Sequence, residues 1–422
     1  MDMDRPEELR WLFLDLNSYF ASVEQQEDSR LRGRPVIVIP APTDSTCVIA
    51  ASYEAKAYGI KTGTPVWEAK RLCPGVILRP ARHQIYVAYH HRIVEEVNRH
   101  IPVDHVASID EMACALLGPE RAPDQAVRIA HHIKNGLREN LGPCIRASIG
   151  IASNVFLAKV GTEIEKPDGL VTLHPGDLPG RLLELRLNDL PGIGRRMHDR
   201  LNQAGIETMA QLWTASALTL HSLWGSAVGR DFWYALHGYD LRHGPGGARG
   251  SISHSRVLGP PERPMEIARL VARRLTVKAA GRLRRLGYRA SFLHMGARLV
   301  DGRRWRAEAA THNAADNLTF LQALEDMWQA MSGHFGHSPL RKVSVVLLGL
   351  QPANHAIPDL LADIDPVCLR RRRAERLSQI MDQLNRRFGQ DTVTLGPSLR
   401  HPAYEGTKIA FTRIPDQAEF WE

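Results

Sequence analysis

The stretch Val106-Ala107-Ser108-Ile109-Asp110-Glu111-Met112-Ala113 is a short apolar run that carries two adjacent carboxylates. A second apolar run, Trp11-Leu12-Phe13-Leu14-Asp15-Leu16-Asn17, also presents an aspartate near its end. Because charged residues are seldom buried, an Asp-Glu pair alone is most often part of a solvated turn. Two strands that bring three acids to one place would instead form a metal site. Asp15, Asp110 and Glu111 are therefore the predicted core of such a site.

Carboxylate oxygens suit a hard divalent cation. Mg²⁺ takes oxygen ligands, keeps some of its waters and completes its shell with substrate phosphates. Two such ions can stabilise both the attacking and the leaving oxygen of an in-line phosphoryl displacement. The three acids thus point to phosphoryl transfer.

The composition predicts a soluble protein of several domains. At 422 residues the chain exceeds what one core usually holds, and 44% hydrophobic with 24% charged residues is typical of globular proteins. Its five cysteines include no Cys-x-x-Cys pair, which argues against a disulfide framework and against a zinc site. The acidic N-terminus lacks the parts of a signal peptide, and no apolar run approaches the ~20 residues that span a bilayer. We therefore expect a cytoplasmic protein without a membrane segment.

The positive charge is concentrated in one part of the chain. Between positions 249 and 310 there are 15 Lys or Arg against 4 Asp or Glu. This segment therefore carries +11, whereas the whole chain carries +8 and the remainder about −3. Such an imbalance indicates a polyanionic partner for the segment.

Local patterns predict the elements of the first half. Apolar runs predict strands at 12–15, 35–39 and 47–51, while helices are expected to begin at Ser18 and to span 52–65 with Ser52 as N-cap. A further helix is expected over 123–140, because apolar residues recur there at helical spacing: Ala126, Ile129, Ala130, Ile133 and Leu137.

A Gly-rich tether is predicted at 241–250, followed by a separate module. The module is expected to contain, in order, a strand at 251–257, a helix at 264–286, a hairpin turning at Asp301-Gly302, a helix at 317–332 and a strand at 342–351. Another helix is expected from 369 to near 388.

Six motifs, taken in order, resemble the signatures of Y-family translesion DNA polymerases. They lie at 15–24, 52–65, 108–111, 148–154, 157–159 and 165–169. Each motif is weak alone, but their order and spacing over the first ~240 residues make a specific set.

The resemblance implies an α+β multidomain fold that is likened to a right hand. Its parts would be a palm at 9–20 and 85–175, small fingers at 21–84, a helical thumb with a helix-hairpin-helix at 176–240, a linker at 241–250, a β-α-β-β-α-β little finger at 251–355, and a C-terminal tail at 356–422.

The resemblance also implies a function. The chain would be a template-directed, low-fidelity polymerase that copies past damaged bases by transferring a nucleotide from a dNTP to a primer 3′-hydroxyl. Its cofactor would be Mg²⁺, two ions per active site, held by Asp15, Asp110, Glu111 and the backbone carbonyl of Leu16. Primer-template DNA and dNTPs would be its partners, and the protein would be a monomer.

Five side chains stand at the family's substrate-binding positions. Tyr53, Lys56 and Lys166 occupy positions that contact the triphosphate, although without the family both lysines would be read as solvated. Phe20 stands at the position of the sugar gate, and Tyr19 is the neighbouring alternative.

The sequence departs from the family pattern at three places that bear on how efficient the enzyme would be. Lys56 stands where Arg is usual, so a point charge replaces a bidentate group. Met112-Ala113-Cys114-Ala115 replaces the common Ala-Tyr-Leu-Asp, and Val155 stands where Lys often follows the Asn. None of them removes a metal ligand.

Two regions are candidates for contact with DNA. The segment 190–201 resembles a helix-hairpin-helix in which Gly192, Gly194 and Arg195 would meet a phosphate, with a plain helix-helix turn as the alternative. On the helix 264–286, the expected buried stripe is Ile267, Leu270, Val271 and Leu275. Another, basic face of this helix is expected to bind phosphates unless it is merely solvated, and it consists of Arg274, Lys278, Arg282 and Arg285.

The C-terminal region offers a candidate for partner binding. The segment 384–393 resembles the C-terminal part of the catalytic subunit of polymerase V. Some family members bind the sliding clamp through a short peptide near this end, and 417–421 could serve for the clamp or for other repair proteins. A plain tail is the alternative.

Two other functions compete with the polymerase reading. A catalytically weak or inactive Y-family homologue would act as a DNA-repair scaffold, but loss of the acids would mark it, and all three are present. A metal-dependent phosphodiesterase would use the same ions without needing the triphosphate-binding lysines or the tether.

Overall fold

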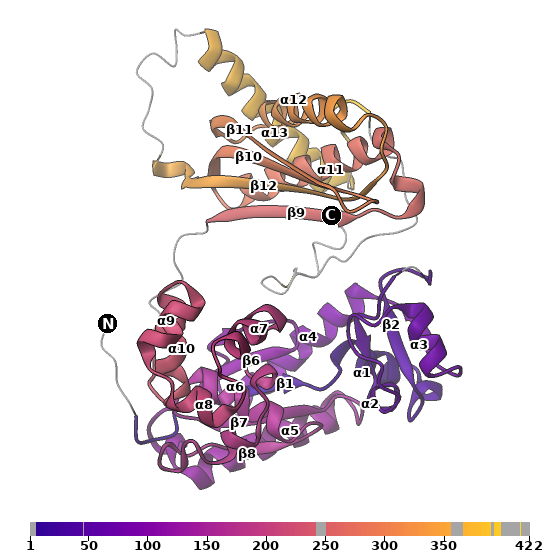
Figure 1. Ribbon diagram of the computed structural model, residues 1–422. Coiled ribbons are helices and arrows are strands. Elements are labelled where there is room, and N and C mark those ends of the chain that lie inside the picture. Colours follow the sequence, from indigo (N-terminus) through magenta and orange to yellow (C-terminus); the bar gives the residue numbers. More distant parts are fainter. Residues whose placement is uncertain are drawn as a thin grey trace. The chain divides into compact units, whose positions relative to one another are not determined.

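The computed structural model describes residues 6–44, 46–241, 250–355, 366–389, 392–397 and 414. Of these, 6–241 belong to one compact unit and 250–397 to a second, so the boundary falls within the expected tether. Both units combine helices with sheets (Figure 1), which confirms the predicted α+β multidomain class. No helix among the described residues is long and apolar enough to cross a membrane.

The first unit contains two sheets. The larger has the strand order β5-β6-β1-β7-β8, and its centre β1 pairs antiparallel with β6 and β7. The smaller has the order β3-β2-β4. The strands are β1 (Trp11–Leu16), β2 (Val36–Ile39), β3 (Ala50–Ala51), β4 (Ile77–Pro80), β5 (His105–Val106), β6 (Glu111–Ala115), β7 (Ala147–Ala152) and β8 (Leu170–Thr172).

Helices pack against both sheets. They are α1 (Tyr19–Glu27), α2 (Tyr53–Lys56), α3 (Val66–Leu72), α4 (His83–Asn98), α5 (Pro123–Asn140), α6 (Val155–Ile164), α7 (Arg195–Gln203), α8 (Met209–Thr214), α9 (Ala217–Trp224) and α10 (Ala227–Leu236). Short 3₁₀ turns occur at Ser29–Leu31, Gly118–Arg121, Pro175–Asp177, Gly180–Glu184 and Leu187–Asp189. The predicted helix 123–140 is confirmed as α5, whose predicted apolar residues are all buried.

Alternate residues of β1 face two different layers, because side chains along a strand alternate between its faces. Leu12, Leu14 and Leu16 share a core with α4 and α5. Phe13 packs on the other side with α6. Asp15 belongs to the same alternate set as Phe13, so the strand delivers its carboxylate toward the α6 side.

Glycines allow α6 to lie unusually close to β7. A Cβ atom on Gly150 would lie 1.9 Å from the carbonyl oxygen of Ala158, and one on Gly161 would lie 3.1 Å from the Cα of Gly150. Such a close approach of two backbones requires residues without a side chain. The packing fixes α6 beside the strands that carry the acids.

The predicted helix at 52–65 is wrong beyond its first turn. Ser52 caps α2 as expected, accepting a hydrogen bond from the Ala55 N–H at 3.3 Å, but the helix ends at Lys56. Gly59 and Gly63 have φ angles of 81° and 90°, which are left-handed and incompatible with a continuous helix. The strand expected at 47–51 is likewise reduced to β3.

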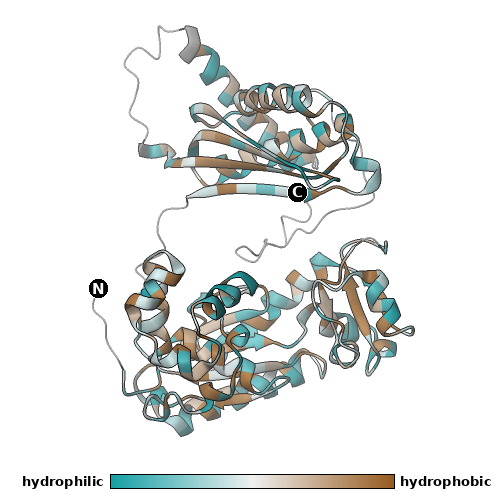
Figure 2. Cartoon of the chain, in the orientation of Figure 1, coloured by the Kyte–Doolittle hydropathy of each residue, from teal (hydrophilic) through white to brown (hydrophobic). Residues whose placement is uncertain are grey.

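The turn before α7 has the predicted local geometry. Gly192 has a φ of 89°, and Gly194 is the N-cap of α7. Figure 2 shows α7 as mainly hydrophilic and β2 as hydrophobic, in keeping with a helix that buries only Leu201 and a strand that is fully buried.

The second unit is a four-stranded antiparallel sheet with helices on one face (Figure 1). Its strand order is β11-β10-β12-β9. The predicted β-α-β-β-α-β order is confirmed as β9 (Ser251–Val257), α11 (Met265–Arg285), β10 (Tyr288–Leu299), β11 (Arg304–Ala314), α12 (Asn317–Phe335) and β12 (Leu340–Pro352), with 3₁₀ turns at Pro260–Glu262 and Ala353–His355.

The buried face of α11 differs from the expected aliphatic stripe. Val271 is buried, whereas Ile267, Leu270 and Leu275 are only partly so. The residues that face the core are mostly small, and they are Met265, Ala268, Val271, Ala272, Thr276, Ala279, Ala280 and Leu283. Small side chains let a helix approach its neighbours closely, so residue size misled the prediction.

A third helix, α13 (Pro366–Phe388), also belongs to the second unit, and it matches the helix expected from 369. Asp382 accepts two hydrogen bonds of 2.7 Å each from Arg284 of α11. Glu375 accepts two bonds, of 2.6 and 2.8 Å, from Arg289 of β10. The suggested clamp-binding segment 417–421 lies outside the described residues.

Candidate active site

The three predicted acids lie at neighbouring ends of two paired strands. Asp15 of β1 stands opposite Glu111 of β6 in the antiparallel register. The backbone N–H of Leu16 donates to the carbonyl of Asp110 at 2.8 Å, which ties the acidic turn to the end of β1. The fold therefore brings Asp15, Asp110 and Glu111 into one neighbourhood, with the backbone of Leu16 beside them.

Asp15 is buried and Asp110 is partly buried, and removal from water costs both carboxylates free energy. Burial raises the pKa of Asp15 from 3.8 to about 6, although Lys166 opposes the shift with its ammonium 3.0 Å from Oδ2. Burial also raises the pKa of Asp110, even though the Ser108 hydroxyl donates to its Oδ1 at 2.5 Å. Both groups would gain from a nearby cation that stabilises their ionised forms.

The donor set fits a hard divalent ion. In the described ranges, no group of three or more His, Cys, Asp or Glu side chains is placed so that it could hold a metal ion by itself. Mg²⁺ does not require one, because it keeps several waters and takes substrate phosphates as further ligands. Buried carboxylates whose charge is poorly compensated are suitable partners for it.

The predicted triphosphate-binding residues converge on Asp15 from separate elements. The ammonium of Lys56 lies 4.3 Å from the centre of the Tyr53 ring on α2. Burial and the nearby charge of Lys166 lower the pKa of Lys56. Burial raises the pKa of Tyr53, on which the charge of Lys166 has a lowering effect and that of Asp15 a raising effect. Two ammonium groups near buried acids make a site that suits a polyphosphate with its cation.

The loop that carries Lys166 is held to the strand ends. The Asn17 side chain accepts a hydrogen bond from the Asp168 N–H at 2.7 Å and donates to the Ser148 hydroxyl at 3.0 Å. Lys166 also contacts Glu163 at 2.7 Å. The motifs at 15–24, 148–154 and 165–169 therefore form one hydrogen-bonded arrangement.

The two aromatic candidates have different environments. Tyr19 is only 3% exposed, and its hydroxyl donates to the Tyr86 carbonyl at 2.5 Å. Its hydroxyl and ring are used within the core, so the predicted substrate contact of Tyr19 is not supported. Phe20 is partly exposed and remains the candidate for the sugar position.

Sequence reasoning assigned no role to Lys159 and did not single out Ser108 or Glu163. Lys159 of α6 forms an ion pair with Glu111. The sequence did hold a sign that Lys159 and Glu163 face the same site, because residues four apart on a helix share a face.

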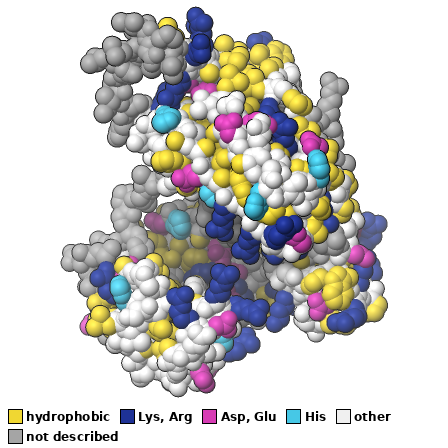
Figure 3. Space-filling view, turned by 45° about the horizontal axis from the view of Figure 1, so that its top comes forward, with side chains coloured by type: hydrophobic (Ala, Val, Ile, Leu, Met, Phe, Trp, Pro, Cys, Tyr) yellow, Lys and Arg dark blue, Asp and Glu magenta, His cyan; other side chains and the backbone are white. Residues whose placement is uncertain are grey.

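Most of the predicted DNA contacts are exposed. Arg195 is exposed at the start of α7, next to Gly192 and Gly194. On α11, Arg274 and Lys278 are exposed, and Arg282 is partly buried. Lys and Arg side chains are visible across both units in Figure 3.

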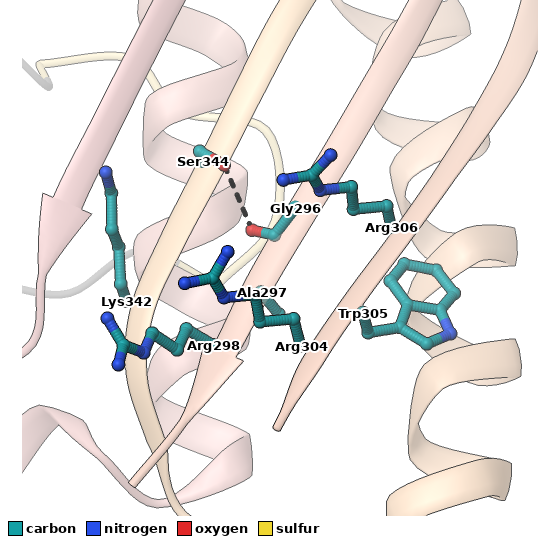
Figure 4. A pocket seen from close by; sticks show the side chains of 8 residues that line it. All are labelled: Gly296, Ala297, Arg298, Arg304, Trp305, Arg306, Lys342 and Ser344. Carbon is teal, nitrogen blue, oxygen red and sulfur yellow. Dashed lines mark hydrogen bonds between the residues drawn. The ribbon is translucent and has the colours of Figure 1, made fainter. Parts of the chain in front are cut away.

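The open face of the sheet in the second unit carries a basic cluster that the sequence reading missed. Arg298 of β10 stands opposite both Arg304 of β11 and Lys342 of β12. Together with Arg306 these side chains line a depression, seen in Figure 4, where Ser344 donates to the Gly296 carbonyl at 3.2 Å. The sequence did hold a sign of this cluster, because Arg304 and Arg306 are two residues apart and therefore share one face of β11.

Comparisons with known proteins agree with this organisation. Residues 14–163 match the impB/mucB/samB family, 188–240 match the thumb domain of DNA polymerase-iota, and 249–360 match the C-terminal domain of the impB/mucB/samB family. A Y-family DNA polymerase chimera has a similar fold, with a TM-score of 0.69 and 23% identity over 81% of this chain and 99% of that chain.

Two curated relatives are similar over nearly their whole length. DNA polymerase IV of Moorella thermoacetica is 33% identical over 402 residues, covering 92% of this chain and 96% of the relative. DNA polymerase IV of Pelotomaculum thermopropionicum is 31% identical over 399 residues, covering 92% and 95%. The chain therefore belongs to the Y family of DNA polymerases and is a DNA-directed DNA polymerase.

Proposed function

We propose that this polymerase carries out template-directed, low-fidelity translesion synthesis, adding nucleotides from dNTPs to a primer 3′-hydroxyl. The observation that carries the proposal is the convergence of three acids with Tyr53, Lys56 and Lys166. A phosphodiesterase would need the acids alone. The scaffold alternative is disfavoured because no acid is missing.

Asp15, Asp110, Glu111 and the carbonyl of Leu16 would hold two Mg²⁺ ions. Such ions, when bound, lower the pKa of the attacking hydroxyl and stabilise charge on the phosphoryl oxygens. The protein's own contribution is to hold the buried carboxylate of Asp15 and the partly buried carboxylate of Asp110 in place, where their raised pKa values favour a cation beside them.

The triphosphate would lie against Tyr53, Lys56 and Lys166. Lys166 is engaged with Asp15 at 3.0 Å, and phosphate oxygens would compete for its ammonium. Phe20 would pack under the deoxyribose and leave no space for a 2′-hydroxyl.

The second unit would supply most of the affinity for primer-template DNA. Arg298, Arg304, Arg306 and Lys342 lie on the sheet face that none of the described helices covers, whereas Arg274, Lys278 and Arg282 lie on the helical layer. Gly192, Gly194 and Arg195 would add a phosphate contact from the thumb.

The domain boundaries given by the resemblance form part of the proposal. The palm would comprise 9–20 and 85–175, the fingers 21–84, the thumb 176–240 and the little finger 251–355. α13 would extend the little finger, since it forms ion pairs with α11 and β10. A cytoplasmic monomer that meets a sliding clamp or other repair proteins through 417–421 completes the proposal.

A primer-extension assay on undamaged and abasic templates tests the function. The full chain should extend primers on both templates with Mg²⁺. Asp110→Ala and Glu111→Ala should abolish extension while leaving DNA binding nearly intact, because the proposed DNA contacts lie elsewhere. Asp44→Ala, which removes an exposed carboxylate paired with Lys70, is the matched control and should extend normally. Near-normal extension by either active-site variant would show that the site is misassigned.

A further inference from the structure

We propose that Lys159 is a positioning residue for this polymerase: its ammonium holds the Glu111 carboxylate in the orientation needed at the active site. The inference rests on the function proposed above. Nothing in the family signatures quoted above gives Lys159 a role of its own.

Lys159 makes its ion pair with one oxygen of Glu111, Oε1. Both side chains are largely shielded from water, with 25% and 24% of their surface exposed. The ammonium also lies 5.1 Å from the centre of the Phe13 ring, on the face of β1 that bears Asp15. The contact thus restrains the Glu111 carboxylate through Oε1.

The backbone of Lys159 is held firmly, which a positioning role requires. Asn154 caps α6 by accepting from the Leu157 N–H at 2.7 Å, and its amide donates to the carbonyls of Ala235 and Tyr239 at 2.8 and 2.9 Å. The close packing at Gly150 fixes the same turn against β7. Lys159 therefore approaches Glu111 from a rigid helix.

Lys159 and Lys166 have separate tasks in this arrangement. Lys166 pairs with Asp15 and Glu163 and is the proposed triphosphate contact. Lys159 pairs with Glu111 and reaches the chemistry through it. Loss of Lys166 should therefore raise KM for the nucleotide, whereas loss of Lys159 should lower kcat and weaken binding of the divalent ion.

The central variant is Lys159→Met, which keeps the apolar stem over Phe13 and removes the charge. Groups that orient metal-binding carboxylates typically contribute about 10–100-fold to metal affinity or activity. Single-nucleotide insertion should show kcat reduced by roughly that factor, with KM for the dNTP changed by less than about threefold. Lys159→Arg, which restores a cation, should recover part of kcat.

A readout other than activity is the binding of Mn²⁺ to the full-length protein without nucleotide, followed by electron paramagnetic resonance. Lys159→Met should weaken this binding, and Lys70→Met, which removes the exposed lysine paired with Asp44, should not. Thermal unfolding and DNA binding of each variant establish that the fold is retained.

The outcomes separate this inference from the function it rests on. If Glu111→Ala is inactive but Lys159→Met retains both kcat and Mn²⁺ affinity, the positioning role is wrong and the proposed function stands. If Lys159→Met raises KM with kcat unchanged, Lys159 contacts the nucleotide instead. If Glu111→Ala itself extends primers normally, the proposed site fails.

Discussion

The Phe20 ring stacks on Tyr86, with ring centroids 4.4 Å apart and planes inclined by 15°. The Tyr86 hydroxyl donates to Glu24 Oε1 at 2.8 Å. Arg82 binds the same carboxylate through two bonds of 2.9 and 2.7 Å, and Glu24 is only 1% exposed. The aromatic ring proposed to lie under the sugar is therefore supported from behind by a buried, charge-assisted network.

Phe20→Ala should admit ribonucleotides. Removing the ring opens space for a 2′-hydroxyl, and each ~1.4 kcal/mol of relieved clash is a tenfold change in rate, so the ratio of ribo- to deoxynucleotide incorporation should rise by about an order of magnitude or more. Single-nucleotide insertion kinetics with matched triphosphates would measure it. An unchanged ratio, or a larger change in Tyr19→Ala, would identify a different gate.

Tyr86 should affect sugar discrimination through Phe20. Tyr86→Ala keeps the Phe20 side chain but removes the ring on which it stacks. The Phe20 ring should then be less restrained, and discrimination against ribonucleotides should relax. Tyr86→Phe keeps the stack and loses only the bond to Glu24, so it is the matched control and should discriminate nearly as the parent does. The same insertion assay applies. Equal behaviour of the two variants would mean that the stack does not restrain Phe20.

The carboxylates were predictable because each stands in or beside a short apolar run, whereas the pairing of the two runs followed from the family resemblance and not from a local pattern. The buried residues of α5 were predictable for a similar reason, since their spacing matches the helical period. The ion pair of Lys159 with Glu111 was not, because it joins residues 48 positions apart and depends on the approach of α6 to β7 at Gly150. Tertiary packing, which no local pattern encodes, sets that contact.

One wrong expectation and one omission had physical causes. The helix expected over 52–65 was extended through Gly59 and Gly63, whose left-handed backbone breaks it. The DNA contacts expected on α11 stay a prediction, and a second basic surface was overlooked because only basic residues at helical spacing are conspicuous in the sequence. The open sheet face assembles Arg298, Arg304 and Lys342 from three strands, and only their register brings them together.

The sheet face should contribute more to DNA affinity than the basic face of α11. The double variant Arg304→Ala/Arg306→Ala removes two exposed charges from β11 and should make DNA binding less dependent on salt. The slope of log Kd against log salt concentration should fall by about 0.9 for each lost phosphate contact. Arg274→Ala/Lys278→Ala is the charge-matched control on α11. Fluorescence anisotropy over a salt series would compare them, and a steeper loss in the α11 variant would restore the original assignment.

The raised pKa of Asp15 predicts a conflict between stability and function. The pKa of Asp15 is about 6 in the folded protein and 3.8 ordinarily, so its carboxyl group binds a proton more tightly in the folded state. Its contribution to stability is therefore greatest below pH 3.8 and is lost as the pH rises through 6. Asp15→Asn, which removes the buried charge, should raise the melting temperature of the metal-free protein at pH 7.5, and the gain should shrink as the pH falls through this range.

Primer extension by the same variant should be lost, because the proposed cation site lacks a carboxylate. Melting curves over pH 4–8 in a chelating buffer test this, with Asp44→Asn as the exposed control. A variant that is less stable than the parent at pH 7.5 would show that the pairing of Asp15 with Lys166 outweighs the cost of burial.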